Sequence, residues 1–423
     1  MLVDVVSSSG QHVSSQLAGP LGQAQVLQTD GLGWLFFALA VLVCSLLIPT
    51  LTGAARVISF FLLMVVFVVS TYLLVSTNNL IGFLFLWELT AMSAWGVGKL
   101  GLRGGNPVLG ALPVNAVGSL SFIAMFAFIT LLVIHSGSLE MGDIKTTTPS
   151  LLMALLLIAI LLKVFGLLSN AWFEGNEVAF PVSNALLASA GVAVVGVYPF
   201  VRFAGEFVLL SHDAQSLAIW TSLAIALVFA LATLRELDLY RIASLLTFSQ
   251  FCLVVAAASV VNQQAISGSL FAVIANALAA IILFLSIGVV CESTSARRLS
   301  DLGGLARLRP ALAFVFLVAV LAASGIPPFG TFVGKIATSF VVLGYPDPLA
   351  GAVWVAAWSA IVLSLFRVLT AVLFPTSSAV ALERVNVFPM IPIAAGSALL
   401  LIAALSPDLV IWLLQPAVWR SFG

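Results

Sequence analysis

A few charged side chains stand inside long apolar stretches of this sequence, and their types could support proton transfer. Glu88 is the only charge in IGFLFLWELTAM (residues 81–92), Lys163 lies in LLMALLLIAILLKVFGLLSNAW, and Lys335 ends GIPPFGTFVGK. A charged residue at the centre of an apolar helix costs roughly 2.5 to 3.5 kcal/mol, so such residues usually face a protein interior or a wet cavity. Burial and mutual attraction act in opposite directions on the proton affinity of a carboxylate and an amine, so small changes in hydration can move a proton. The three residues therefore predict a proton relay.

Each of these residues also has a simpler interpretation. Glu88 and Lys163 could form a structural ion pair that pins two helices together. Lys335 could extend its ammonium group to a membrane surface, as long basic side chains do. Arg367, in LSLFRVLTAVLF, lies nearer a helix end and is a secondary candidate for the same reason.

The composition requires a membrane environment for the elements that carry these residues. Hydrophobic residues make up 62% of the chain, charged residues 8%, and the mean hydropathy is +1.22, whereas soluble domains carry about 25% charged residues. Apolar stretches of about 20 residues, long enough to cross a bilayer as helices, recur from Gly31 onward. We therefore expect an all-α integral membrane protein with about twelve transmembrane helices, in a single transmembrane domain over residues 31–423. The expected spans are 31–52, 56–76, 79–98, 108–134, 151–171, 181–203, 216–234, 242–262, 266–290, 311–339, 351–374 and 387–414.

Prolines are expected to interrupt two of these helices. Pro327 and Pro328 lie in a span longer than crossing requires and should divide it into two half-helices. A similar interruption is expected near Pro181. Lys163 and Lys335 would then each lie beside a broken helix in one half of the chain, as an inverted repeat produces. The approximate repeat halves are residues 56–203 and 216–374.

The distribution of basic residues predicts the orientation. One set of alternate loops carries Arg56, Lys99, Arg103, Arg235, Arg241, Arg297, Arg298, Arg307, Arg309 and Arg384, and the other carries Lys145, Arg202 and Arg420. Cytoplasmic loops of membrane proteins carry the excess of Lys and Arg. Both termini are therefore expected outside the cytoplasm, with residues 1–30 as a polar extracytoplasmic tail. The expected location is the inner (cytoplasmic) membrane of a bacterium.

No motif in the sequence indicates a catalytic site, a cofactor or a bound metal. There is no Walker A sequence, no dinucleotide fingerprint, and no Cys or His cluster for a haem or iron–sulfur centre. The formal net charge is zero, which argues against nucleic acid as a partner. Energy for transport would therefore have to come from another protein.

Several segments match motifs of one membrane family. TDGLGWLFFALAVLV (29–43) and FLFLWELTAMSAW (83–95), with Glu88, are two of them. LLKVFGLLSNAWFEGNEVAFPVSNALL carries Lys163 and a Trp nine residues later, and ASGIPPFGTFVGK ends in Lys335. RELDLYRIASLLTFSQF adds an amphipathic helix entry and a Ser-Gln pair. These segments resemble the antiporter-like membrane subunits of respiratory complex I, a family shared with Mrp-type cation/proton antiporters and membrane-bound hydrogenases.

The resemblance implies a function and partners. It implies that Glu88 and Lys163 modulate one another and that protons pass along a hydrated central axis to Lys335. The chain would be a proton (or cation/proton) translocating subunit of an energy-coupling complex such as a complex-I-like NADH:quinone oxidoreductase or a membrane-bound hydrogenase. Its implied partners are homologous antiporter-like subunits, a redox or other energy-supplying module, bilayer lipid, and H⁺ or Na⁺ as the transported ion.

The chain departs from the family in mid-channel. Where the family usually carries His or Lys, this sequence has Ala188 and Val194, and later Asn276 and Ala280. Water could bridge this gap if polar side chains anchor it. The candidate anchors are Asn276, Ser189, Ser183, Asn184 and Ser249, and the alternative for each is an ordinary hydrogen bond in helix packing.

Two other functions remain open from the sequence. One is a proton-conducting membrane partner of a peripheral zinc enzyme in an inorganic-carbon (CO₂ or bicarbonate) uptake system. The loss of titratable residues in mid-channel is compatible with that function. The other is a structural subunit that has lost transport and only spaces its neighbours.

Overall fold

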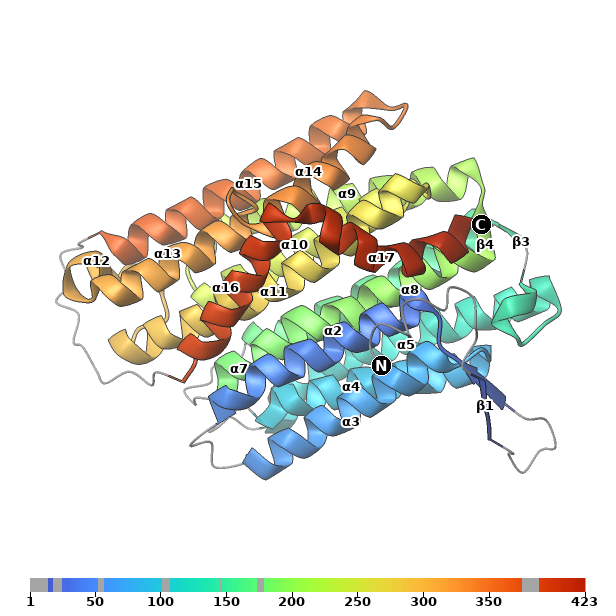
Figure 1. The fold of residues 1–423 in the computed structure, drawn as a ribbon, viewed down its shortest axis with the longest axis horizontal. Coiled ribbons are helices and arrows are strands. Elements are labelled where there is room, and N and C mark those ends of the chain that lie inside the picture. Colours follow the sequence, from blue (N-terminus) through green and yellow to red (C-terminus); the bar gives the residue numbers. More distant parts are fainter. Residues whose placement is uncertain are drawn as a thin grey trace.

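Long apolar helices build almost all of the described structure. The computed structural model describes residues 14–17, 25–51, 57–100, 107–144, 146–172, 179–374 and 388–422. In this part of the chain, ten helices are long and apolar enough to cross a membrane. Most of them lie side by side in one bundle (Figure 1). The prediction of an all-α multi-pass membrane protein is confirmed.

The helix bounds follow the apolar stretches closely. The helices are α2 (Gly31–Leu47), α3 (Val57–Ser76), α4 (Leu80–Leu100), α5 (Pro107–Ser136), α6 (Ser150–Leu168), α7 (Ala179–Leu186), α8 (Tyr198–Val201), α9 (His212–Thr233), α10 (Leu239–Ala258), α11 (Gln263–Thr294), α12 (Leu305–Leu308), α13 (Pro310–Ser324), α14 (Gly330–Leu343), α15 (Pro348–Leu373), α16 (Met390–Leu405) and α17 (Pro407–Phe422). Short 3₁₀ turns lie at Ile48–Leu51, Met141–Asp143, Ser169–Trp172 and Leu299–Asp301.

Two pairs of short strands accompany the helices. The strand β1 (Ser14–Leu17) pairs antiparallel with β2 (Gln25–Gln28). The strand β3 (Thr146–Thr148) pairs in parallel with β4 (Val208–Leu210), and so connects the entry of α6 to the segment before α9. Most of the expected polar tail, including residues 1–13 and 18–24, lies outside the described residues.

One span contains unusual backbone. Helices α7 and α8 belong to a single buried span, Pro181–Ala204, in which π-helical turns occupy Leu187–Gly191 and Ala193–Val197. Pro181 lies in the first turn of α7, where the missing N–H of a proline is tolerated. Residues 173–178, which connect the end of the α6 segment to α7, lie outside the described part of the chain.

The expected break at Pro327 and Pro328 is present. Helix α13 ends at Ser324, Gly325 adopts a left-handed conformation (φ +70°), and α14 begins at Gly330. The peptide bond between the two prolines is cis. Proline lacks an N–H donor, so neither residue can continue the helical hydrogen-bond pattern. The expected span 311–339 is therefore two short apolar helices.

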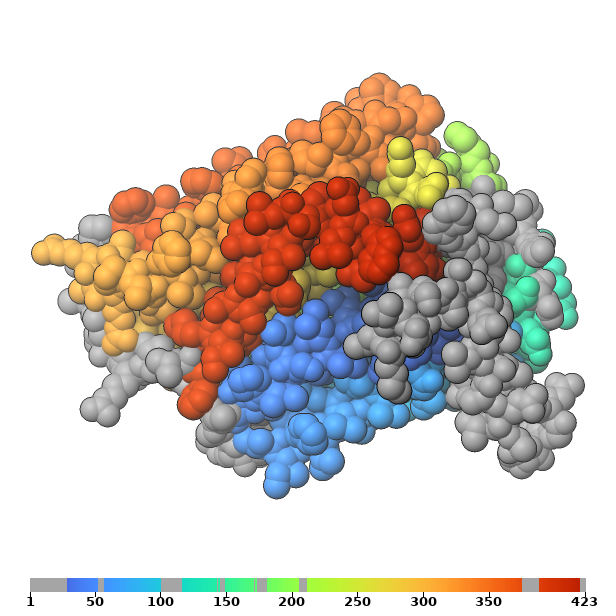
Figure 2. Space-filling view, in the orientation of Figure 1, coloured from blue at the N-terminus to red at the C-terminus, as the bar shows by residue number. Residues whose placement is uncertain are grey.

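A second bend was not expected. The sequence predicts one span over residues 387–414, but α16 and α17 meet at 91° at Ser406. The bend arises because Pro407 removes a backbone donor and Ser406 before it leaves the helical conformation (φ −133°, ψ 64°), so the expected span is present as a bent helix pair. The ten long helices, the α13–α14 pair and the α16–α17 pair together account for the twelve expected spans. Figure 2 shows α16 and α17, in red, crossing one face of the molecule.

The core lies along α7–α8, α10 and α11. Helix α11 contacts α7, α10, α13, α14 and α16, and nearly all of its length is buried. Only 33% of the apolar stretch is buried in α3 and in the described part of α5, as expected for helices that face lipid. A Cβ on Gly334 would stand 2.9 Å from Ala272 Cα of α11, and one on Gly330 would stand 2.9 Å from Ala403 Cβ of α16. These two glycines therefore let α14 approach two different helices closely.

Candidate functional site

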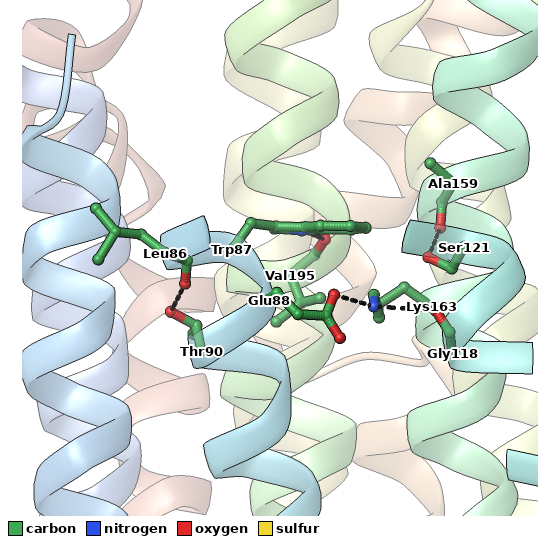
Figure 3. A network of polar contacts seen from close by, with 9 residues as sticks. All are labelled: Leu86, Trp87, Glu88, Thr90, Gly118, Ser121, Ala159, Lys163 and Val195. Atoms are coloured by element: carbon green, nitrogen blue, oxygen red, sulfur yellow. Dashed lines mark hydrogen bonds and ion pairs between the residues drawn. The ribbon is translucent and has the colours of Figure 1, made fainter. Parts of the chain in front are cut away.

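The structure brings Glu88 of α4 and Lys163 of α6 into direct contact. Lys163 Nζ donates to Glu88 Oε2 at 2.6 Å and to the carbonyl oxygen of Gly118, in α5, at 3.4 Å (Figure 3). The lysine side chain is 5% exposed and the glutamate side chain 28% exposed. The pair therefore joins three helices, with the lysine in the interior and the carboxylate nearer the surface of the bundle.

Trp87 supplies a further contact for the lysine. Lys163 Nζ lies 4.6 Å from the centroid of the Trp87 ring, which is close enough for a cation–π interaction. The indole Nε1 of Trp87 donates to the carbonyl oxygen of Val195 at 2.8 Å. Val195 lies in the second π-helical turn, where the backbone hydrogen bonds shift from i→i+4 to i→i+5. Trp87 thus links the ion pair to the irregular backbone of the next span.

This link predicts the effect of a conservative substitution. The variant Trp87→Phe removes the hydrogen bond to Val195 and weakens the cation–π contact, which together are worth about 1 to 3 kcal/mol. We expect the free energy of unfolding of the purified protein to fall by about the same amount, measured by thermal unfolding.

A second buried tryptophan provides the control for that experiment. Trp354 in α15 is buried, and within the described part of the chain its indole N–H donates no hydrogen bond. The variant Trp354→Phe breaks no such hydrogen bond and should therefore lose less stability than Trp87→Phe. Equal losses in both variants would show that Trp87 only fills space.

Lys335 lies in the first turns of α14, beside the break. The residue is 3% exposed, and a Cβ on Gly325 would stand 2.8 Å from its Cγ. The nearby Thr338 and Ser339 hydroxyls donate to backbone carbonyls of α14. Among the residues that the structure describes, the Lys335 ammonium group has neither a hydrogen bond nor an ion pair. The lysine is therefore buried and does not extend to a membrane surface.

A small cavity lies between α7–α8, α10 and α11. Its volume is about 30 Å³, enough for a water molecule. Its polar lining consists of Ser189, Thr247, Gln250 and Asn276. Within the described residues the Asn276 amide makes no hydrogen bond of its own. A water molecule in the cavity could therefore form a hydrogen bond with the Asn276 amide.

The positions that depart from the family lie at or near this cavity. Ala188 lines it, and the adjacent Ala277 does so as well. Val194 and Ala280 are buried in the same two elements, the α7–α8 span and α11. Ala188 and Ala277 have small side chains, and the cavity that they line has room for a water molecule.

The secondary candidates have ordinary partners. Ser249 donates to the carbonyl oxygen of Ala226 at 2.8 Å, which is a helix-packing contact between α10 and α9. Ser183 is fully buried in α7 and is hydrogen-bonded. Arg367 donates to the carbonyl oxygens of Thr233, at 2.9 Å, and of Glu236, so it holds α15 against the end of α9. These partners of Ser249 and Arg367 do not include Glu88, Lys163 or Lys335.

Sequence reasoning missed one buried ion pair. Asp30 caps α2 by accepting from the Gly33 N–H at 2.7 Å, and its other oxygen pairs with the Arg202 guanidinium. The orientation argument assigns Arg202 to a loop, but it is buried inside the Pro181–Ala204 span. The available signal was an Asp directly before an apolar run and an Arg within an expected span. Within the described residues, no group of His, Cys, Asp or Glu could hold a metal ion.

Comparison with known proteins identifies relatives of this arrangement. The family model described as "NADH:quinone oxidoreductase/Mrp antiporter, TM" matches residues 77–373, more than half of the chain. NADH-quinone oxidoreductase subunit M of Rhodobacter capsulatus is 24% identical over 170 residues, which are 40% of this chain and 33% of that protein. The first three curated relatives are matched over only 33%, 45% and 56% of their own lengths.

Solved structures share the fold. A chain of the Mrp complex from Dietzia sp. DQ12-45-1b matches with a TM-score of 0.82 at 21% identity, over 100% of this chain and 48% of that chain. A chain of respiratory complex I from Thermus thermophilus with bound NADH matches with a TM-score of 0.78 at 18% identity, over 100% of this chain and 92% of that chain. As the motif resemblance indicated, the chain belongs to the NADH:quinone oxidoreductase/Mrp antiporter transmembrane family.

Proposed function

We propose that this chain translocates protons as an antiporter-like subunit of a multisubunit energy-coupling complex. The observation that carries the proposal is the contact of Glu88 with the buried Lys163, in the same bundle as a small cavity lined by Gln250 and Asn276 and as the buried amine of Lys335. A structural ion pair alone would need neither the cavity nor a second buried amine. The named relative and the solved neighbours, which come from a quinone oxidoreductase and an Mrp complex, support the same function.

The first half of the route runs from Lys163 to the cavity. Val164, next to Lys163, packs against Gly196 so tightly that a Cβ there would stand 2.5 Å from Val164 Cγ2. Gly196 belongs to the π-helical turn that receives the Trp87 hydrogen bond, and Ala193 and Val197 of that turn line the cavity. The π-helical turn Ala193–Val197 therefore lies between Lys163 and the cavity.

The second half runs from the cavity to Lys335. Gln250 lines the cavity, and its Nε2 donates to the carbonyl oxygen of Ala323 at 2.8 Å. Ala323 lies two residues before Gly325, against which Lys335 packs. On α11, Asn276 lines the cavity, and Ala272, one turn earlier, contacts Gly334 beside Lys335.

Water completes the route in this proposal. Bridging waters form hydrogen bonds nearly as good as direct ones, so they can connect groups that do not touch. Asn276 and Gln250 are suitable anchors because an amide both donates and accepts hydrogen bonds. Ser183 and Ser249 are less suitable, since both are already hydrogen-bonded. H⁺ is the transported ion that two buried amines, Lys163 and Lys335, and the amides of the cavity support best.

Glu88 supports the proposed partnership with other membrane subunits. Its side chain is 28% exposed, and the apolar residues near it on α4, Phe85 and Met92, are 65% and 59% exposed. A partly exposed carboxylate facing hydrocarbon is costly. A neighbouring antiporter-like subunit over this face would cover the carboxylate, and an energy-supplying module elsewhere in the complex would drive transport.

Location and orientation complete the proposal. We place the chain in the inner membrane of a bacterium with both termini outside the cytoplasm, since Arg235, Arg241 and Arg298 gather at one end of the bundle. The repeat halves 56–203 and 216–374 remain part of the proposal, with Lys163 in the first and Lys335 in the second. Of the alternatives open from the sequence, the comparisons favour the energy-coupling complex over a carbon-uptake partner.

The substitution Glu88→Gln tests the proposed function. Glutamine keeps the side-chain size and an oxygen for Lys163 to bind, so we expect the complex to assemble, with a loss of thermal stability because Lys163 loses its counter-charge. Glutamine cannot exchange a proton, and a positioned proton-transfer group contributes roughly 10²-fold or more. Proton uptake by proteoliposomes that contain the intact assembly should therefore fall on the order of 10²-fold.

A matched carboxylate provides the control. Glu140 is exposed at the turn before Met141–Asp143, far along the chain from the site. Glu140→Gln should leave proton uptake at the wild-type rate. A fully assembled Glu88→Gln complex with wild-type flux would instead support the view that the chain is a spacer.

A further inference from the structure

A second, larger cavity lies at the basic end of the bundle. Its volume is about 420 Å³, and it opens between the α9–α10 connection and the residues that follow α11. Four arginines line it, Arg235, Arg241, Arg297 and Arg298, together with Glu236 and Asp238. The transport route does not use this cavity.

Both acidic residues are turned to local partners. Glu236 Oε1 accepts from the backbone N–H groups of Leu237, at 2.8 Å, and Asp238, at 3.1 Å. Asp238 Oδ1 accepts from the Arg241 N–H at 3.0 Å, and its other oxygen pairs with Arg297. Arg297 also lies 5.0 Å from the centroid of the Tyr240 ring. The two carboxylates and Arg297 therefore build the walls of the cavity.

Three guanidinium groups remain to bind a ligand. Among the described residues, Arg235 and Arg298 form no ion pair, and both are exposed. The guanidinium group of Arg241 donates to the carbonyl oxygen of Trp172, at 3.3 Å, and forms no ion pair within the described residues. The flat, forked donor set of arginine matches the oxygens of a phosphate group. The chemistry of the cavity is therefore that of a phosphate site.

The apolar surroundings indicate which phosphate compound fits. Leu237 lines the cavity and is 48% exposed. On α9, Val228 and Leu231 are 63% and 48% exposed, and on α15, Leu363 and Phe366 are 62% and 46% exposed. Each pair is spaced by three residues, which places its members on one helix face. Arg367, next to Phe366, bonds to the carbonyl of Glu236, so these faces lie beside the cavity.

We propose that this cavity binds the headgroup of an anionic phospholipid, with its acyl chains over the exposed faces of α9 and α15. The phosphate would lie between Arg235, Arg241 and Arg298, at the level where helices end and headgroups begin. Basic pockets between helix ends on the cytoplasmic side are suited to such lipids. A soluble phosphate compound would leave the apolar faces unused. The lipid would fix the α9–α10 connection to the end of α11.

The test measures lipid retained by the full chain, purified in its membrane assembly and stripped of lipid with detergent. Phosphatidylglycerol and phosphatidylcholine are added back, and bound lipid is counted by mass spectrometry. We expect phosphatidylglycerol to be retained in preference. Arg298→Gln and Arg235→Gln should each weaken its binding about fivefold, the factor that corresponds to about 1 kcal/mol per arginine near a membrane surface.

Arg307 provides the matched control, because it is exposed at the same end of the bundle but does not line the cavity. Arg307→Gln should leave lipid binding unchanged. Equal loss in the Arg307 variant, or equal retention of phosphatidylcholine, would overturn the proposal. Displacement of the lipid by an equal concentration of inorganic phosphate or glycerol phosphate would indicate a soluble ligand. An acidic segment of another subunit in the cavity, with no lipid retained, would also overturn it.

Discussion

Lys335→Met is expected to abolish proton translocation while leaving the fold intact. The ammonium group is buried beside Gly325, and the described residues offer it neither a carboxylate nor a hydrogen bond. An apolar side chain of similar length removes the cost of burying this charge, so stability should be unchanged or increased. Proton uptake driven by a K⁺ diffusion potential should fall on the order of 10²-fold or more.

A lysine at the end of a span serves as the control for this result. Lys99 lies at the end of α4, with its Nζ 5.1 Å from the centroid of the Trp95 ring. Lys99→Met should retain most of the flux. If the Lys335→Met assembly conducts protons at the wild-type rate, Lys335 is not part of the proton route.

Lys163→Met is expected to reduce both stability and flux. The substitution leaves Glu88 without the cation that lies 2.6 Å from its carboxylate. Removing one partner of a buried ion pair costs up to about 3 to 5 kcal/mol. The cost should lie below that range here, because the Glu88 side chain is 28% exposed and can become protonated. Thermal unfolding of the purified assembly and proton uptake measure the two effects separately.

A double variant separates the structural from the functional role of the pair. In Glu88→Gln/Lys163→Met no unpaired charge remains, so thermal stability should return close to the wild-type value. Proton uptake should stay as low as in Lys163→Met alone. Recovery of flux together with stability would mean that the pair only holds α4 against α6.

The sequence predicts most of the fold because charge and proline are so costly inside a membrane. Glu88, Lys163 and Lys335 stand out because each interrupts an apolar run that otherwise carries no charge. The break between α13 and α14 follows from two adjacent prolines after a glycine, a combination that cannot continue a helix. Local chemistry alone is enough for these predictions.

Other features depend on contacts between distant segments. Asp30 and Arg202 are 172 residues apart in the chain, so their pairing is not visible from either neighbourhood. The cavity at Asn276 forms only where small side chains of the α7–α8 span, α10 and α11 face one another at the same level of the bundle. The 91° bend at Ser406 could not be predicted because a single proline is tolerated inside many transmembrane helices.

The central claim is that Glu88 and Lys335 act in series on one route through the Asn276 cavity. The direct test compares voltage-driven proton uptake by assemblies carrying Glu88→Gln, Lys335→Met and both substitutions together. A single route predicts that each variant blocks uptake and that the double variant is no slower than the slower single one. Additive losses in the double variant, or substantial flux in either single variant, would mean that the two residues lie on separate paths.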